Sequence, residues 1–184
     1  MLTFGRDPNA KVTKKSKSPL SFHPIALIFG LLSFVSYLVE GAVGDWSALY
    51  LFEDKGIVIE EAVMGVMLFN GTMCIGRLLG NRLGKHLTSK QVVVGGYLLG
   101  SIAMGLIVFL PGHASMYTYL LLGISLAMIV PNLFSAMGEQ NVIPMTQAVA
   151  TSTMLGYMGI LMGPALIGFI AHGTSLTVAF IVLT

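Results

Sequence analysis

Five long apolar stretches, and the start of a sixth, follow one another along the chain with short polar or glycine- and proline-containing segments between them. Such stretches are typical of helices that cross a bilayer, which need about 20 residues each. We expect helices over residues 24–52, 60–80, 91–110, 116–137 and 144–171, with a sixth beginning at residue 175. Only ten residues remain from there, so we expect the sixth helix to be truncated.

The first stretch is unusual in its length. Its 29 residues, 24–52, are too many for one straight crossing and too few for a helical hairpin of about 40 residues. Glycine is the poorest helix former after proline. We therefore expect one long helix that is broken at Gly41 and Gly44. The third stretch has a clear end, because Pro111-Gly112 is a strong helix-breaking pair.

The composition places this bundle in a membrane. Hydrophobic residues make up 55% of the 184 residues and charged residues 10%, whereas a soluble domain carries about 25% charged residues. We therefore expect an all-α, polytopic membrane bundle over residues 22–184, after a basic tail over residues 1–21. The lipid bilayer is its expected surrounding, and a net charge of +2 is too small to indicate nucleic-acid binding.

The sequence contains no recognisable catalytic or metal-binding pattern. Cys74 is the single cysteine, which excludes an intramolecular disulfide and a cysteine-based zinc site within this chain. The four histidines lie near expected helix ends, and none forms a His-Glu-x-x-His pair. We expect no enzyme activity, no cofactor and no metal.

The basic residues predict the orientation, because positively charged segments are retained in the cytosol. With the amino terminus in the cytosol, only Lys55 of the ten basic residues falls on the outer side. The other nine, all expected at the cytosolic face, are Arg6, Lys11, Lys14, Lys15, Lys17, Arg77, Arg82, Lys85 and Lys90. We expect a multi-pass protein of the plasma membrane, the bacterial inner membrane.

A polar stripe on the first helix contains one ionisable residue, Glu40. The stripe recurs at spacings of three, four and seven residues, and it consists of Ser33, Ser36, Tyr37, Glu40 and Gly44. A charge in the bilayer costs about 2.5–3.5 kcal/mol on insertion scales, so Glu40 should face protein or a water-filled cavity. It either binds a polar solute or a coupling proton, or hydrogen-bonds freed backbone groups at the expected break.

Other polar residues accompany the acidic residue. Asp45 is a weaker candidate for the same site, beside Trp46, which suits the membrane interface. The fourth helix repeats the polar stripe through Asn132 and Ser135, and Pro131 removes one backbone hydrogen bond there. Its buried amide suits a sugar or another hydroxyl-rich ligand, but it can equally join two helices. Both alternatives also hold for Asn70 of the second helix.

The fifth helix has a face of small residues that allows another helix to approach closely. This face is formed by Ser152, Gly156, Gly159 and Gly163, and Pro164 follows it. We interpret it as a packing surface. A separate stripe, Thr146, Thr153 and Tyr157, is a candidate pathway lining.

Residues 76–85 read GRLLGNRLGK, which resembles the loop signature Gly-x-x-x-Asp-Arg-x-Gly-Arg of the major facilitator superfamily. The residues that carry the resemblance are Gly76, Arg77, Gly80, Asn81, Arg82, Gly84 and Lys85. Its place after the second helix of a six-helix unit also matches the family. The chain departs from the signature at Asn81, where an aspartate is typical, and an asparagine cannot form an ion pair.

Two further stretches resemble the bacterial fucose-permease-like branch of that family. They are residues 40–48 (EGAVGDWSA) and residues 129–136 (IVPNLFSA), which correspond there to the seventh and tenth of twelve helices. Residues 159–168, with Gly163-Pro164, look like the eleventh helix. The resemblance covers residues 22–184 and implies the carboxy-terminal half of the fold, with the basic tail as the connector between halves.

The resemblance implies secondary transport by alternating access of two six-helix bundles. We expect a carrier for a small polar solute, with a proton-coupled sugar as one candidate, that requires a complementary amino-terminal half. Its expected solute- or proton-binding residues are Glu40, Tyr37, Asn70, Asn132, Ser135 and Asp45. The alternative is a non-transporting membrane module, either a truncated gene product or an assembly partner of other membrane proteins.

Overall fold

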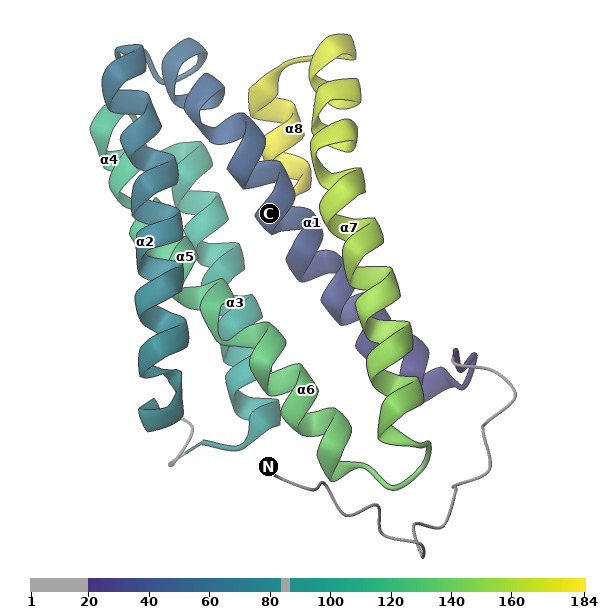
Figure 1. The fold of residues 1–184 in the computed structure, drawn as a ribbon. Coiled ribbons are helices and arrows are strands. Elements are labelled where there is room, and N and C mark those ends of the chain that lie inside the picture. Colours follow the sequence, from purple (N-terminus) through teal and green to yellow (C-terminus); the bar gives the residue numbers. More distant parts are fainter. Residues whose placement is uncertain (1–19, 84–86) are drawn as a thin grey trace, which may run out of the picture.

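The computed structural model describes residues 20–83 and 87–184, and regular structure in this part of the chain consists of helices alone (Figure 1). The helices are α1 (Pro24–Glu53), α2 (Ile59–Leu83), α3 (Ser89–Phe109), α4 (Gly112–Tyr117), α5 (Tyr119–Ala127), α6 (Ile129–Glu139), α7 (Met145–Gly173) and α8 (Leu176–Val182). The expected all-α class is therefore confirmed.

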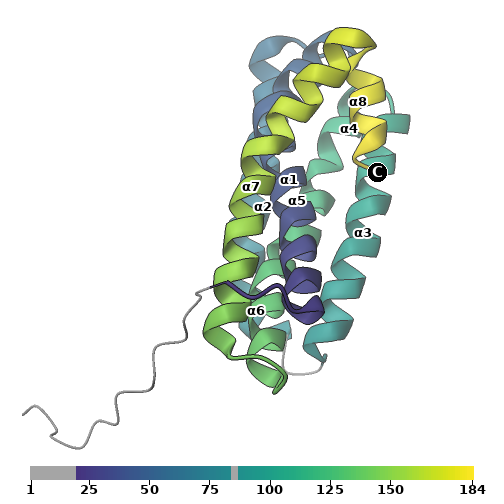
Figure 2. The same ribbon diagram turned by 90° about the vertical axis from the view of Figure 1, so that its right-hand side faces the viewer.

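Five segments of the described chain are long and apolar enough to cross a membrane, and four of them are the single helices α1, α2, α3 and α7. The fifth, Gly112–Glu139, contains α4, α5 and α6 in succession. The helices lie side by side in an elongated bundle (Figure 2). Together with the composition, this architecture makes the chain a multi-pass membrane protein.

The segment between residues 112 and 139 corrects the expectation of one continuous helix over 116–137. α5 ends at Ala127 and α6 begins at Ile129. Pro131 explains this interruption between α5 and α6, because it has no N–H to donate to the carbonyl of Ala127 four residues earlier. Backbone hydrogen bonding resumes one residue later, where the backbone N–H of Asn132 donates to the Met128 carbonyl at 3.2 Å.

The expected break at Gly41 and Gly44 was wrong, because α1 is continuous over 30 residues. At about 1.5 Å per residue it is about 45 Å long, and it runs obliquely beside α7 (Figure 1). Such a tilt fits a long helix into a bilayer core of about 30 Å. Gly41 lets the helices approach, since a Cβ there would lie 2.6 Å from the carbonyl oxygen of Ile160.

Helix α7 packs closely against α1. A Cβ on Gly159 would overlap the carbonyl oxygen of Phe34, and one on Gly163 would overlap the carbonyl oxygen of Leu38. The buried hydroxyls of Ser33 and Ser152 lie 2.6 Å apart within this contact. We call this contact, formed by Ser33, Phe34, Leu38, Ser152, Gly159 and Gly163, the α1–α7 seam.

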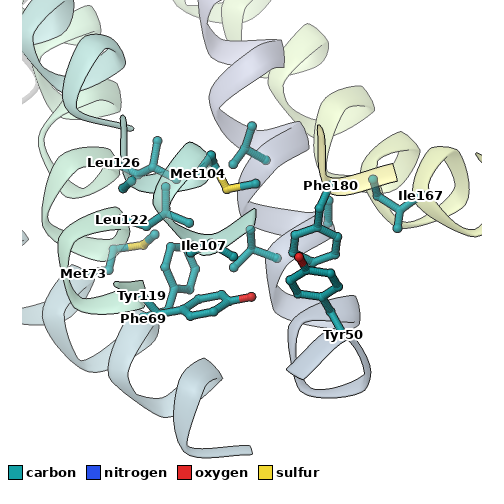
Figure 3. Close-up of a cluster of buried hydrophobic side chains, with 14 of the residues drawn as sticks. Tyr50, Phe69, Met73, Met104, Ile107, Tyr119, Leu122, Leu126, Ile167 and Phe180 are labelled. Atoms are coloured by element: carbon teal, nitrogen blue, oxygen red, sulfur yellow. The ribbon is translucent and has the colours of Figure 1, made fainter. Parts of the chain in front are cut away.

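An aromatic and aliphatic core fills the bundle at the end where α1 finishes (Figure 3). The Tyr50 ring stacks on Phe180 of α8 with centroids 4.2 Å apart. Phe69 and Tyr119, from α2 and α5, are also buried there. This core therefore ties the short helix α8 to the rest of the bundle.

Lys55 fixes the carboxy terminus of α3 at the same end of the bundle. Its ammonium donates hydrogen bonds to the carbonyls of Val108 at 2.6 Å and Leu110 at 2.8 Å, which lack helical donors there. It also lies 5.3 Å from the centroid of the Tyr50 ring. Burial lowers the pKa of Lys55, and the neighbouring carboxylate of Asp54 partly offsets this effect. The one basic residue expected outside thus has a structural contact of its own.

Candidate functional site

A pocket of about 420 Å³ lies between α1, α2 and α6. Pockets of about 300–1,000 Å³ are the usual size for small-molecule sites. Its lining residues are Tyr37, Glu40, Arg77, Val130, Pro131 and Phe134. They come from three helices, of which α6 is far from α1 and α2 in the sequence, so the fold brings this site together.

An ion pair between Glu40 and Arg77 crosses the pocket from α1 to α2. One guanidinium nitrogen of Arg77, Nη2, lies 3.5 Å from Oε1 and 3.4 Å from Oε2 of Glu40. The Arg77 side chain is 45% exposed and that of Glu40 is 23% exposed. Glu40 is residue 17 of the 30 in α1, so the pair lies near the middle of that helix.

The sequence pointed to Glu40 but placed Arg77 among the basic residues of the cytosolic face. In the structure, Arg77 lies within α2, six residues before its end at Leu83, and its side chain reaches Glu40. Intramembrane charges usually pair with one another. This tendency could have linked the two residues from the sequence, because each is a charged residue within an apolar helix.

Aromatic rings border the charged side of the pocket. The Tyr37 ring is parallel to that of Tyr157, with an interplanar angle of 4° and centroids 6.5 Å apart. Gly156 makes room for it, because a Cβ there would lie 2.6 Å from the Tyr37 ring. Tyr157 was expected in a stripe of α7 with Thr146 and Thr153, a candidate pathway lining, and its ring lies beside that of the pocket residue Tyr37.

Tyr97 of α3, which the sequence did not indicate, holds α1 next to the pocket. Its hydroxyl donates to the carbonyl of Leu32 at 2.5 Å and therefore accepts from Ser36, 2.7 Å away. Ser36 directly precedes Tyr37 in the chain. Polar residues of the expected stripe thus bind three different helices: Ser33 meets α7, Ser36 meets α3 and Glu40 meets α2.

The other expected site residues hydrogen-bond mainly within their own helices. The side-chain amide of Asn70 donates to the Val66 carbonyl at 3.0 Å, and the side-chain amide of Asn132 donates to the Met128 carbonyl at 2.8 Å. The Ser135 hydroxyl donates to the Pro131 carbonyl at 3.2 Å. Asn132 is half-buried, whereas Asn70, Ser135 and Asp45 are exposed. Asn70, Asn132, Ser135 and Asp45 are not among the residues that line the pocket around Glu40.

The expected loop signature begins inside α2. Gly76 is buried where α2 meets α5, since a Cβ there would lie 2.6 Å from Cβ of Ala127, and a Cβ on Gly80 would overlap the Met128 side chain. Asn81 and Arg82 belong to the last turn of α2. Gly84 and Lys85 lie outside the described residues.

Pro164 interrupts the backbone hydrogen bonding of helix α7, which packs against α1. A proline cannot donate to the carbonyl four residues earlier, so the Ile160 carbonyl lacks its helical donor, and Gly41 lies against this oxygen. The carbonyl of Pro164 itself accepts a hydrogen bond from the Trp46 indole at 3.0 Å. Within residues 20–83 and 87–184, no group of three or more His, Cys, Asp or Glu side chains could hold a metal ion.

Three curated proteins are similar in sequence to this chain. An uncharacterized MFS-type transporter of Yersinia pestis is 42% identical over 84% of this chain and 40% of its own length. The membrane protein MosC of Rhizobium meliloti is 31% identical over 82% of this chain and 37% of its own length. An uncharacterized transporter, y4wD, of Sinorhizobium fredii is 28% identical over 85% of this chain and 42% of its own length. No protein-family model matches the chain.

These relatives define the class of protein to which the chain is similar, namely membrane transporters. The Yersinia protein narrows that similarity to transporters of the major facilitator type. The chain spans about two-fifths of the length of the curated relatives it matches. A multi-pass protein with such relatives is consistent with the bacterial inner membrane.

Proposed function

We propose that the chain, over residues 22–184, is the carboxy-terminal six-helix half of a secondary carrier that moves a small polar solute by alternating access. The observation that carries this proposal is the pair of opposite charges, Glu40 and Arg77, facing a pocket near the middle of α1. Ionisable residues at such depth are costly and mark solute or proton pathways. The similarity to membrane transporters supports the same interpretation.

A complementary amino-terminal bundle is the partner that this proposal requires. The chain spans about two-fifths of the curated relatives, so these proteins have further chain outside the matched region. Arg77 remains 45% exposed, which means that the described residues do not enclose the pocket. In carriers built from repeated halves, the solute site lies at the interface between them. We propose that the second half covers the pocket from the exposed side of Arg77.

The proposed orientation places the amino terminus and the α2–α3 connection in the cytosol of a bacterial cell. The basic residues near these segments support it by the positive-inside rule. Lys55 lies at the opposite end of the bundle. Its hydrogen bonds to two α3 carbonyls give a structural reason for one basic residue there.

Glu40 is the proposed proton-coupling residue, and Arg77 is its partner. In the proton-free state the carboxylate holds the guanidinium. When Glu40 takes up a proton it loses its charge and releases the cationic group that it held. Tyr37 lines the same pocket, and we keep Asn70, Asn132, Ser135 and Asp45 as proposed solute contacts of the complete carrier. The sequence resemblance suggests a sugar as the solute.

The test is uptake by the chain co-expressed with a complementary amino-terminal half, assayed with labelled sugars and other metabolites. We expect Glu40→Gln to abolish proton-coupled uptake, because a side-chain amide cannot take up and release a proton as a carboxylate does. The protein should stay in the membrane. Glu53→Gln, at the exposed end of the same helix, is the matched control and should leave uptake unchanged. Normal uptake by Glu40→Gln would remove Glu40 from the mechanism. If the unsubstituted chain and its complementary half insert into the membrane but move no solute, the result favours the non-transporting module.

A further inference from the structure

The pocket has one charged side and one apolar side. Tyr37, Glu40 and Arg77 supply its polar groups, from α1 and α2. The facing wall, from α6, consists of Val130, Pro131 and Phe134. A solute that fits this arrangement has its polar groups at one end and an apolar surface at the other.

The asparagine amides in the sequence suggested a hydroxyl-rich solute, but their contacts make such a solute a poor fit for this pocket. The side-chain amides of Asn70 and Asn132 donate to carbonyls of their own helices, as does the Ser135 hydroxyl. A sugar carries hydroxyls around its whole ring. Those facing the α6 wall would lose water without gaining a partner, and an unpaired buried polar group is costly.

The charges on the polar side are both available to a solute. Charge-assisted hydrogen bonds usually measure about 2.7–2.9 Å, whereas Arg77 Nη2 stays 3.4–3.5 Å from the two carboxylate oxygens of Glu40. Only one of the guanidinium nitrogens takes part, and a guanidinium has five N–H donors. The remaining donors can bind an anionic group while Glu40 accepts from a cationic one.

The two charges also sum to zero, which selects the net charge of the solute. A simple anion beside Arg77 would be repelled by Glu40, and a simple cation beside Glu40 would be repelled by Arg77. A molecule that carries both charges on neighbouring atoms meets neither penalty. In an α-amino acid the ammonium and the carboxylate are bonded to the same carbon, and Glu40 and Arg77 are likewise adjacent.

We propose that the solute is a small amphipathic zwitterion, an α-amino acid with an apolar side chain. Its carboxylate binds Arg77, its ammonium binds Glu40, and its side chain packs against Val130, Pro131 and Phe134. This assignment rests on the proposed carrier function and names the substrate class of the same pocket.

Binding to the purified full-length chain in lipid nanodiscs tests the assignment by calorimetry. The probes are L-leucine, L-fucose, 4-methylpentanoate, which keeps the carboxylate but lacks the ammonium, and 3-methylbutylamine, which lacks the carboxylate. We expect L-leucine to bind at least tenfold more tightly than each of the other three. Circular dichroism verifies that every variant used below keeps its helices.

Two charge variants show whether the recognition has the proposed polarity. Arg77→Gln should weaken L-leucine binding at least tenfold and make 3-methylbutylamine the tighter of the two single-charge probes. Glu40→Gln should weaken L-leucine equally and favour 4-methylpentanoate. Lys90→Gln, on the exposed start of α3, is the control and should leave all four affinities unchanged.

Each outcome separates the assignment from the carrier function on which it rests. Tighter binding of L-fucose than of L-leucine would overturn the zwitterion and leave the polar-solute carrier in place. L-Leucine binding that neither charge variant weakens would also overturn it, because the solute would then lie elsewhere. If none of the four probes binds, the zwitterion is overturned, and the uptake assay with the complementary amino-terminal half then tests the carrier function separately.

Discussion

The two sides of α1 differ in how they meet their neighbours. Towards α7, the Gly159 and Gly163 backbones touch the α1 carbonyls of Phe34 and Leu38, and a buried hydroxyl pair lies between the helices. Towards α2 and α6, α1 borders a pocket of about 420 Å³. Within the described residues, it is linked to α2 there by a long ion pair with a half-exposed arginine. At the level of the pocket, one side is closed by backbone contact and the other is bridged by two long side chains.

This difference separates stability from proposed function along a single helix. Close backbone approach gives membrane helices most of their association energy, through van der Waals packing. Exposed ion pairs contribute only about 0–1 kcal/mol. The α1–α7 seam should therefore hold the fold, while the Glu40–Arg77 pair is free to exchange partners. Substitutions in the seam should mainly lower stability, whereas substitutions of Glu40 or Arg77 should mainly weaken solute binding.

The largest expected effect is on the α1–α7 seam. Gly163→Ala adds a methyl group that would overlap the Leu38 carbonyl, and a backbone atom cannot turn aside as a flexible side chain can. Overpacking of this kind costs about 1–3 kcal/mol, and we expect the upper part of that range. Reversible unfolding in mixed micelles of mild detergent and dodecyl sulfate measures the loss.

Gly44→Ala on α1 is the matched control, because a Cβ on Gly44 meets nothing within 4 Å. Alanine is a better helix former than glycine by about 1 kcal/mol, so this variant should be equally or more stable than the parent. If Gly163→Ala unfolds at the same dodecyl sulfate fraction as the parent, the close seam is wrong.

The sequence predicted the membrane spans well because hydrophobicity over about 20 residues determines them locally. The sequence failed where contact with a neighbouring helix determines the role of a residue. Gly41 suggested a break, because glycine is a poor helix former, yet it lies against the carbonyl that Pro164 leaves without a donor. Which distant residue uses a glycine for close approach cannot be read from the local sequence.

The candidate site was only partly visible for the same reason. Glu40 stood out, since an isolated carboxylate in an apolar helix is costly wherever that helix packs. Its partner Arg77 was assigned to the cytosolic face from its position near the end of α2. The packing of α1 beside α2 and the long arginine side chain allow the two to meet. The roles proposed for the remaining polar residues are still predictions.

A smaller effect is expected from the hydroxyls inside the seam. Ser152 donates to the Phe29 carbonyl at 3.2 Å and therefore accepts from Ser33. Ser33→Ala and Ser152→Ala should each cost about 1 kcal/mol. In a double-mutant cycle the pair should couple by about 0.6 kcal/mol, the average for interhelical hydrogen bonds in membranes. Strict additivity of the two substitutions would show that the hydroxyls do not interact.

The smallest effect on stability is expected from Arg77→Gln, on the open side of α1. A half-exposed pair 3.4 Å long should contribute about 0.5 kcal/mol, so the unfolding midpoint should shift less than for either serine variant. The same substitution should nevertheless abolish uptake by the chain paired with its complementary half, because the solute's carboxylate loses its cationic partner. A loss of stability as large as that of Gly163→Ala would make the ion pair a structural brace. The contrast between the two sides of α1 would then fail, since both would serve to hold the fold together.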